Sequence, residues 1–137
     1  MTSEELKRRT KALAIRVIKL VDALPRTLAA QVIGRQLLRA ATSVGANYRA
    51  ACRAQSRPDF AAKLSIVLEE ADECLYWLEL IQETNLVKAE RLQDLTKEAN
   101  ELVAIMLSSR KTAKTVIVLA NRQSKIDNRK LAGGTPK

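Results

Sequence analysis

Five arginines occur in one stretch of the sequence that contains no carboxylate. The stretch RQLLRAATSVGANYRAACRAQSR spans residues 35–57, and its arginines are Arg35, Arg39, Arg49, Arg53 and Arg57. A guanidinium group binds a phosphate or a carboxylate through two parallel hydrogen bonds. A series of arginines without acidic neighbours therefore favours the binding of a polyanion or of an acidic partner surface.

The spacing of these residues places them on one side of a helix, where they form what we call the arginine stripe. At 100° per residue, all five fall within an arc of about 80°. From Arg35 to Arg53 the stripe runs about 27 Å along the helix axis, enough to follow several phosphates of a nucleic-acid backbone. Two other interpretations stay open, namely a charged face that contacts only water and ion pairs with carboxylates elsewhere in the fold.

The charge of the whole chain favours the same class of partner. Its 137 residues include 24 Lys and Arg against 15 Asp and Glu, which gives a net charge of +9. Such a molecule attracts polyanions through salt-sensitive forces, and nucleic acid leads the list. Few aromatic residues are available for base stacking, so contacts with phosphates and with shape would dominate and sequence specificity would be weak.

The sequence lacks the residues on which most enzyme sites are built. It contains no histidine, the usual general base, and no glycine-rich phosphate loop or zinc signature. A hydrolase that uses Glu70, Asp72 or Glu73 is disfavoured, because a catalytic carboxylate needs a cleft that an outer helix face does not offer. We therefore expect no catalytic residues, no cofactor and no metal ion.

The cysteines and the hydropathy predict the cellular compartment of the protein. Cys52 and Cys74 do not have metal-ligand spacing, and the first residues lack the apolar core of a secretory signal. Both cysteines are therefore interpreted as buried thiols in a reducing compartment. No apolar run approaches the 18 residues of a membrane span, so we expect a cytoplasmic protein without membrane contact.

The elements that must position the arginines are helices. Aromatic residues make up only 3% of the chain and the hydrophobic share is 47%, a balance that favours leucine-rich helices. Apolar spacing, a capping box of Thr2 and Glu5 and a cap at Ser56 predict four of them, over about residues 3–23, 26–55, 57–84 and 88–115. Short connections make neighbouring helices antiparallel. We predict an all-α, antiparallel up-and-down four-helix bundle over residues 1–118, followed by a disordered, flexible basic tail over 119–137.

The predicted second helix has two apolar seams instead of one. The first is Ile33, Leu37, Ala40, Val44, Asn47 and Ala51, and the second is Gly34, Leu38, Ala41, Gly45, Tyr48 and Cys52. Together they cover about half of the helix circumference, more than one neighbour in a simple bundle needs. The second seam is therefore interpreted as part of a contact between subunits. Asn47 needs a hydrogen-bond partner, and a role in helix register is favoured over ligand contact.

Acidic residues gather on the predicted third helix, on a face turned away from the core. They are Glu69, Asp72, Glu73, Glu79 and Glu83. The arginine stripe also faces away from the core, so we expect that neither neutralises the other inside one subunit. Complementary outer faces favour a heterologous contact between subunits, which closes into a ring when the rotation allows. The predicted interface residues are Gly45, Tyr48, Glu70, Asp72, Glu73 and Glu79.

A ring would use some of these arginines and leave other basic residues for nucleic acid. Lys111 and Lys114 join the arginine stripe as predicted nucleic-acid-binding residues. The remaining candidates are Lys7, Arg8, Arg9 and Lys11 near the start of the chain and Arg122, Lys125, Arg129 and Lys130 in the tail. For the tail, a solubilising extension is the alternative interpretation.

Two runs of residues resemble a known bacterial family. QLLRAATSVGAN at residues 36–47, and EADE followed by WLEL between Glu70 and Leu80, have the order and spacing found in the 23S rRNA intervening-sequence proteins. The resemblance covers about residues 24–115. Arg39 and Asn47, together with the acidic Glu70, Asp72 and Glu79, occupy matching positions.

This resemblance implies an all-α up-and-down bundle assembled as a ring, commonly a homopentamer. The family is similar in fold to the accessory variability protein of diversity-generating retroelements, which binds nucleic acid and a reverse transcriptase. Some members are encoded inside 23S rRNA genes, which makes RNA a more natural partner than DNA. A protein partner of unknown identity is the other implied class, with the charged faces then serving assembly alone.

Overall fold

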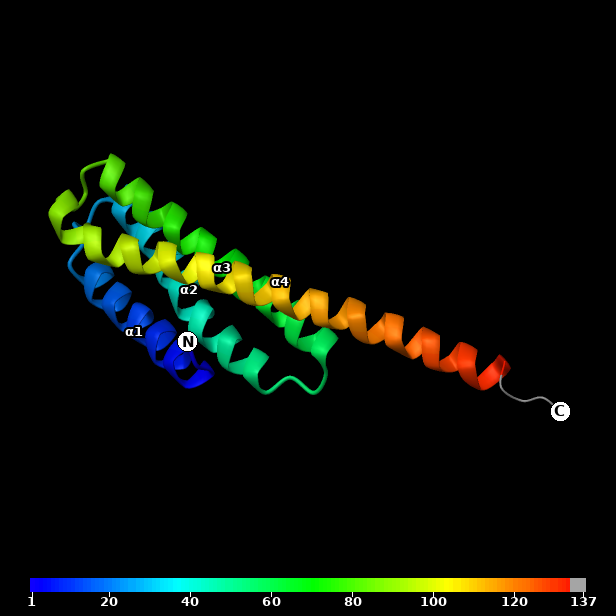
Figure 1. The fold of residues 1–137 in the computed structure, drawn as a ribbon. Coiled ribbons are helices and arrows are strands. Elements are labelled where there is room, and N and C mark those ends of the chain that lie inside the picture. The colour runs from blue at the N-terminus through cyan, green and yellow to red at the C-terminus, as the bar shows by residue number, and fades with distance from the viewer. Residues whose placement is uncertain (134–137) are drawn as a thin grey trace.

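Four α-helices make up most of the fold, and the computed structural model describes residues 1–133 of the chain. The helices are α1 (Ser3–Asp22), α2 (Leu28–Cys52), α3 (Arg57–Glu83) and α4 (Ala89–Gly133). Short connections turn the chain back after each of the first three helices, so successive helices run antiparallel (Figure 1). The predicted all-α up-and-down four-helix bundle is confirmed, and its assembly as a ring stays a prediction.

The helices begin at capping residues. Thr2 and Glu5 form the predicted capping box of α1, in which the Thr2 side chain accepts from the Glu5 N–H and the Glu5 carboxylate accepts from the Thr2 N–H. The Ser56 hydroxyl caps α3 by accepting from the Asp59 N–H. Thr27 caps α2, so this helix begins two residues later than predicted.

Asn85 ends α3 in a way that turns the chain into α4. It has φ 57°, in the left-handed region that asparagine tolerates better than most residues. The Leu86 N–H donates to the Ile81 carbonyl, and the Asn85 N–H donates to the Gln82 carbonyl. These two hydrogen bonds form a Schellman motif, which satisfies the last carbonyls of α3.

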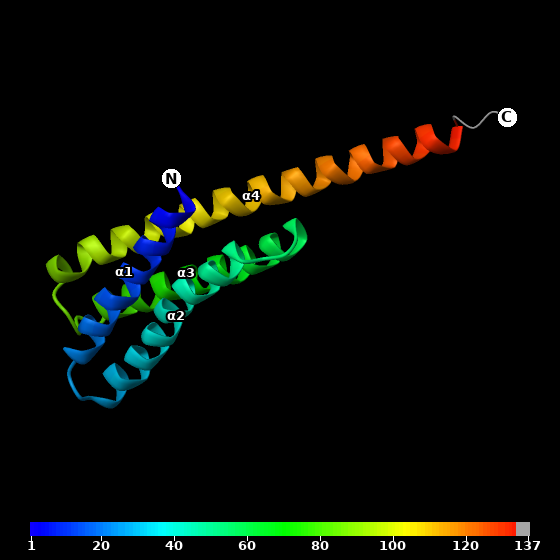
Figure 2. The ribbon, with the colours of Figure 1, turned by 90° about the horizontal axis from the view of Figure 1, so that it is seen from below.

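The core lies between α1, α2, α3 and the first half of α4. Leu13, Leu37, Leu64, Leu78 and Leu102 are among its fully buried side chains. α1 packs mainly on α2 and meets α4 over a short stretch, which it crosses at an angle (Figure 2). Within residues 1–133, no helix combines the length and apolar character needed to cross a membrane.

The second seam of α2 packs against α1 inside the same subunit. A Cβ atom on Gly34 would lie 3.3 Å from side-chain atoms of Val21 and Leu24, and one on Gly45 would lie 3.4 Å from Thr10. Tyr48 is only 4% exposed. The interpretation of this seam as an intersubunit contact is therefore corrected, because α1 already covers it.

α4 continues through the segment predicted to be a flexible tail. The prediction placed the end of the bundle at residue 118, whereas the helix extends to Gly133 and projects beyond the other helices (Figure 1, Figure 2). No proline or glycine interrupts the sequence between Leu86 and Ala132, and most of its residues are good helix formers. Residues 134–137, the rest of the predicted tail, lie outside the described residues.

Candidate nucleic-acid interface

Arg39, the second residue of the arginine stripe, is neutralised inside one subunit. Its Nη1 lies 3.3 Å from Oε2 of Glu70, and its Nη2 pairs with the Glu73 carboxylate, which also accepts a hydrogen bond from the Trp77 indole. The prediction that the stripe and the acidic residues of α3 do not meet within a subunit is wrong at this position. Glu70 and Glu73 are only partly exposed and lie on the flank of α3 beside α2.

This contact fixes the charge state of the pair. The hydrogen bond from the Arg39 guanidinium holds the pKa of Glu73 below its ordinary value, and the two carboxylates raise the pKa of Arg39. Arg39 therefore already has anionic partners and is a weaker candidate for a phosphate than its neighbours on the stripe.

The other four arginines of the stripe form no ion pair within residues 1–133, and the fold divides them among three places. Arg35 lines a depression at the α1–α2 turn, and Arg57 lines a cleft between α3 and α4. Arg49 and Arg53 share a groove with α1. One continuous stripe on the helical wheel is therefore three separate surfaces in the fold.

The groove between α1 and α2 gathers most of the basic groups. It has a volume of about 490 Å³ and is lined by five cations and one carboxylate. Lys7 pairs with that carboxylate, Glu4, at 3.1 Å, and among the described residues the other four cations form no ion pair. We call these residues the basic groove: Lys7, Arg8 and Lys11 of α1, and Arg49 and Arg53 of α2.

Small residues of α2 make room for this arrangement. Gly45 and Ala46 line the groove floor, and the Thr10 backbone lies close above Gly45. Because α1 approaches so closely, its cations at positions 7, 8 and 11 lie beside those of α2 at positions 49 and 53. The sequence supplied both sets as separate candidates, but it did not indicate that they line one groove.

Arg9 serves the fold instead of the groove. Its Nε lies 2.9 Å from Oε2 of Glu98, and its Nη2 lies 2.9 Å from Oε2 of Glu101, so it joins α1 to α4. These contacts raise the pKa of Arg9, and its hydrogen bond lowers the pKa of Glu98. Arg9 was predicted, with Lys7, Arg8 and Lys11, to be left for nucleic acid, but it is paired within the fold.

The remaining predicted residues lie elsewhere. Lys111 and Lys114 are exposed on the part of α4 that passes the start of α3. Glu69, Asp72 and Glu79 are exposed on the outer face of α3 and form no ion pair within the described part of the chain.

Asn47 finds its hydrogen-bond partner in its own helix, where its Nδ2 donates to the Ser43 carbonyl at 2.9 Å. This contact does not join two helices, so it gives no support to a role in register.

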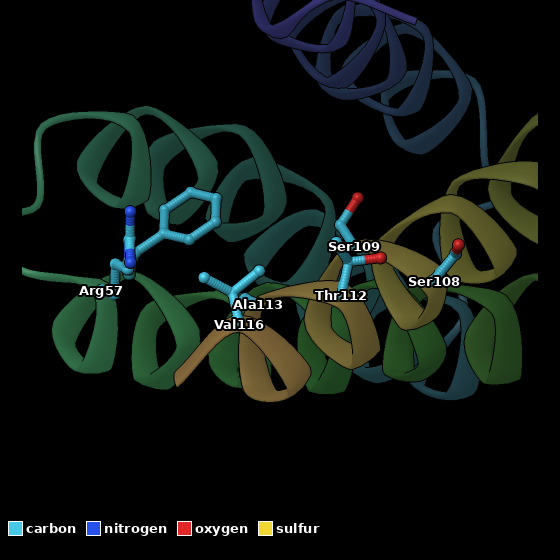
Figure 3. A pocket seen from close by; sticks show the side chains of 7 residues that line it. Arg57, Ser108, Ser109, Thr112, Ala113 and Val116 are labelled. Carbon is cyan, nitrogen blue, oxygen red and sulfur yellow. The ribbon is translucent and has the colours of Figure 1, made fainter. Parts of the chain in front are cut away.

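A second concave surface lies where α4 leaves the bundle. This cleft of about 420 Å³ lies between the start of α3, with Arg57 and Phe60, and the α4 residues Ser108, Thr112 and Val116 (Figure 3). Within residues 1–133, no group of three or more potential ligands is placed to hold a metal ion. The cleft offers hydroxyls, one guanidinium and a phenyl ring.

The geometry defines a helical bundle with a basic groove formed by its first two helices. Residues 4–109 match the family of 23S rRNA-intervening sequence proteins, and the chain belongs to this family. It is also similar to a crystal structure of a protein of unknown function from the S23 ribosomal protein family of Bacteroides thetaiotaomicron. The TM-score is 0.75 with 36% identity, over 81% of this chain and 99% of the other. None of the curated proteins matches the chain.

Proposed function

We propose that this protein is a non-enzymatic, oligomeric RNA-binding protein whose basic groove holds phosphates of the RNA backbone. The observation that carries the proposal is the convergence of five cations from two helices on one groove with a single carboxylate. Phosphates replace the counterions of such a groove, which makes binding favourable and dependent on salt. RNA is preferred over DNA because the family takes its name from 23S rRNA.

The composition of the groove sets the kind of recognition. No aromatic side chain lines it, so stacking with unpaired bases is not available there. Lysine and arginine contacts with phosphates position an RNA without reading its sequence. We therefore propose recognition of RNA shape and charge. We also propose that the protein is located in the cytoplasm. The thiols of Cys52 and Cys74 are free, as expected in that reducing compartment.

The test compares two pairs of arginines from the same stripe. Arg49→Glu with Arg53→Glu reverses two charges in the basic groove, and we expect it to abolish RNA binding in a gel-shift assay at about 50 mM salt. Arg35→Glu with Arg57→Glu makes the same change in charge outside the groove and should retain most of the affinity. If both double variants lose the same RNA affinity, binding depends on the overall charge of the protein, which would contradict the proposal that the basic groove holds the RNA.

An oligomeric protein scaffold is the second candidate function, and one observation favours it. The outer face of α3 carries Glu69, Asp72 and Glu79 without ion pairs in the described chain, next to exposed Ile66 and Tyr76. A second copy that presents arginines would complement this face and close a ring, for which the resemblance implies a pentamer. If wild-type protein forms the ring but retains no RNA at low salt, the scaffold is the function.

A further inference from the structure

The last part of α4 carries a second, separate line of positive charge. We call residues 111–133 the arm; its first residues still line the cleft beside α3, and the rest projects beyond the bundle. At 100° per residue, five of its cations lie within an arc of about 80°, centred on one side of the helix. They are all exposed, and none forms an ion pair within residues 1–133. These residues, the arm stripe, are Lys111, Lys114, Arg122, Lys125 and Arg129.

From Lys111 to Arg129 the arm stripe extends about 27 Å at 1.5 Å per residue. Exposed Val118 is the one apolar residue within it, and the stripe contains no carboxylate. The arm lies beyond residues 4–109, which match the family, and after its first residues it projects away from the rest of the molecule (Figure 2). No other part of the described chain neutralises these charges.

Resting on the proposed function, we infer that the arm stripe is a second contact for the same RNA and binds the backbone of a double-helical segment. A straight series of cations on one helix face matches the regular phosphates of a duplex. The stripe has no aromatic ring, which a single-stranded segment would use for stacking. The groove and the arm then hold one structured RNA at two separate places.

The other face of the arm argues against a membrane as the partner. Val116, Leu119, Ile126 and Leu131 are exposed on the side away from the arm stripe. A helix that lies on a bilayer buries such a face, but here Asp127 falls near its centre. A duplex contacts only the basic face and is compatible with both observations.

The experiment compares two charge-matched pairs in the full chain. Arg122→Gln with Lys125→Gln removes two cations from the arm stripe. Arg110→Gln with Lys130→Gln removes one arginine and one lysine that lie about 80° and 120° from its centre. Glutamine is a good helix former, and circular dichroism checks that the arm remains helical.

Binding of an RNA duplex of about 20 base pairs is measured by fluorescence anisotropy between about 50 and 200 mM salt. The arm-stripe pair should lower the slope of log affinity against log salt by about 1.8, since each lost phosphate contact contributes about 0.9. The control pair should keep the wild-type slope. Equal slopes for both pairs would overturn the inference, as would arm-stripe-dependent binding to anionic lipid vesicles without any effect on the RNA.

An Arg49→Gln with Arg53→Gln variant separates this inference from the proposed function. If it loses RNA while the arm-stripe pair keeps the wild-type slope, the groove stands and the arm inference fails. If the arm-stripe pair lowers the slope and the groove pair does not, the arm stands and the groove fails. A wild-type protein that does not bind the duplex would overturn both.

Discussion

Gly45 determines how closely α1 approaches α2, and thereby how the basic groove forms. The Thr10 backbone lies at 3.4 Å from the position that a Cβ atom would occupy, which is an ordinary contact distance. A methyl group fits there, but a longer side chain does not. Because Gly45 is inside a helix, it also costs the fold backbone entropy.

Substitutions at Gly45 should therefore have opposite effects. Gly45→Ala should stabilise the protein by up to about 1 kcal/mol through helix propensity. Gly45→Leu should destabilise it by about 2 kcal/mol, because the side chain pushes α1 away. Urea denaturation measures both. A Gly45→Leu variant with unchanged stability but a smaller oligomer would instead return this residue to a subunit interface.

The pair formed by Arg9 and Glu98 makes stability depend on acid pH. The Arg9 hydrogen bond keeps the pKa of Glu98 below the ordinary value of 4.5, so the unfolded chain binds a proton before the folded chain does. The stabilisation is complete above this value and is lost as pH falls through the pKa of the folded state. Glu73, paired with Arg39, contributes in the same direction.

Glu98→Gln should cost about 1 kcal/mol of stability near neutral pH, and this cost should shrink as the pH falls below 4.5 and through the pKa of Glu98 in the folded state. The measurement is urea denaturation at several pH values. Glu69→Gln, which removes an exposed carboxylate without an ion pair in the described chain, is the control and should follow the wild type. A constant cost for Glu98→Gln at every pH would mean that packing, and not charge, is responsible.

At the scale of elements, α4 consists of two parts that are held by different forces. Leu92, Leu95, Leu102 and Met106 are buried in the core, whereas every residue from Val118 to Gly133 is exposed. The exposed part continues an existing helix and therefore needs no nucleation of its own, but no packing supports it. Its stability should thus be close to the opening free energy of a fraying helix end.

A chain that ends at Leu119 should keep its unfolding free energy within about 0.5 kcal/mol of the full chain. In the full chain, amide hydrogens of residues 120–133 should exchange far faster than those around Leu102. Addition of duplex RNA should slow exchange in the arm. Strong protection of the free arm would show that another surface already covers it.

At the scale of the whole molecule, charge is divided between faces. The basic groove lies between α1 and α2, while Glu69, Asp72 and Glu79 project from α3. Opposite charges on different faces of one subunit favour a head-to-tail contact, which generates rings. Arg39 pairs with Glu70 and Glu73 on the flank of α3 within the subunit. The acidic residues of the outer face therefore remain as the candidates for a contact between subunits.

If the proposed ring forms, Asp72→Arg with Glu79→Arg should dissociate it. Light scattering should change from a mass of about five subunits to the 15.2 kDa of one, with the helical signal unchanged. Glu90→Arg with Asp94→Arg makes the same change in charge on exposed residues of α4 and should leave the mass as it is. A wild-type mass of one subunit would contradict the ring itself.

The sequence by itself determined the helices, because each depends on neighbours within a few positions. The apolar spacing and the caps at Thr2 and Ser56 predicted three helices to within about three residues. The end of α4 was missed, since residues 119–133 are basic, partly apolar and free of proline, a composition found both in exposed helices and in flexible tails.

Only the tertiary structure decided which groups meet. A helical wheel shows the direction of a side chain but not the neighbour on that side, so it could not show that α1 covers Gly45 and Tyr48. It also could not show that Arg39 of α2 forms an ion pair with Glu70 of α3, or that Lys7 of α1 and Arg49 of α2 line one groove. These contacts join residues more than 30 positions apart, and their distances depend on how closely the helices pack.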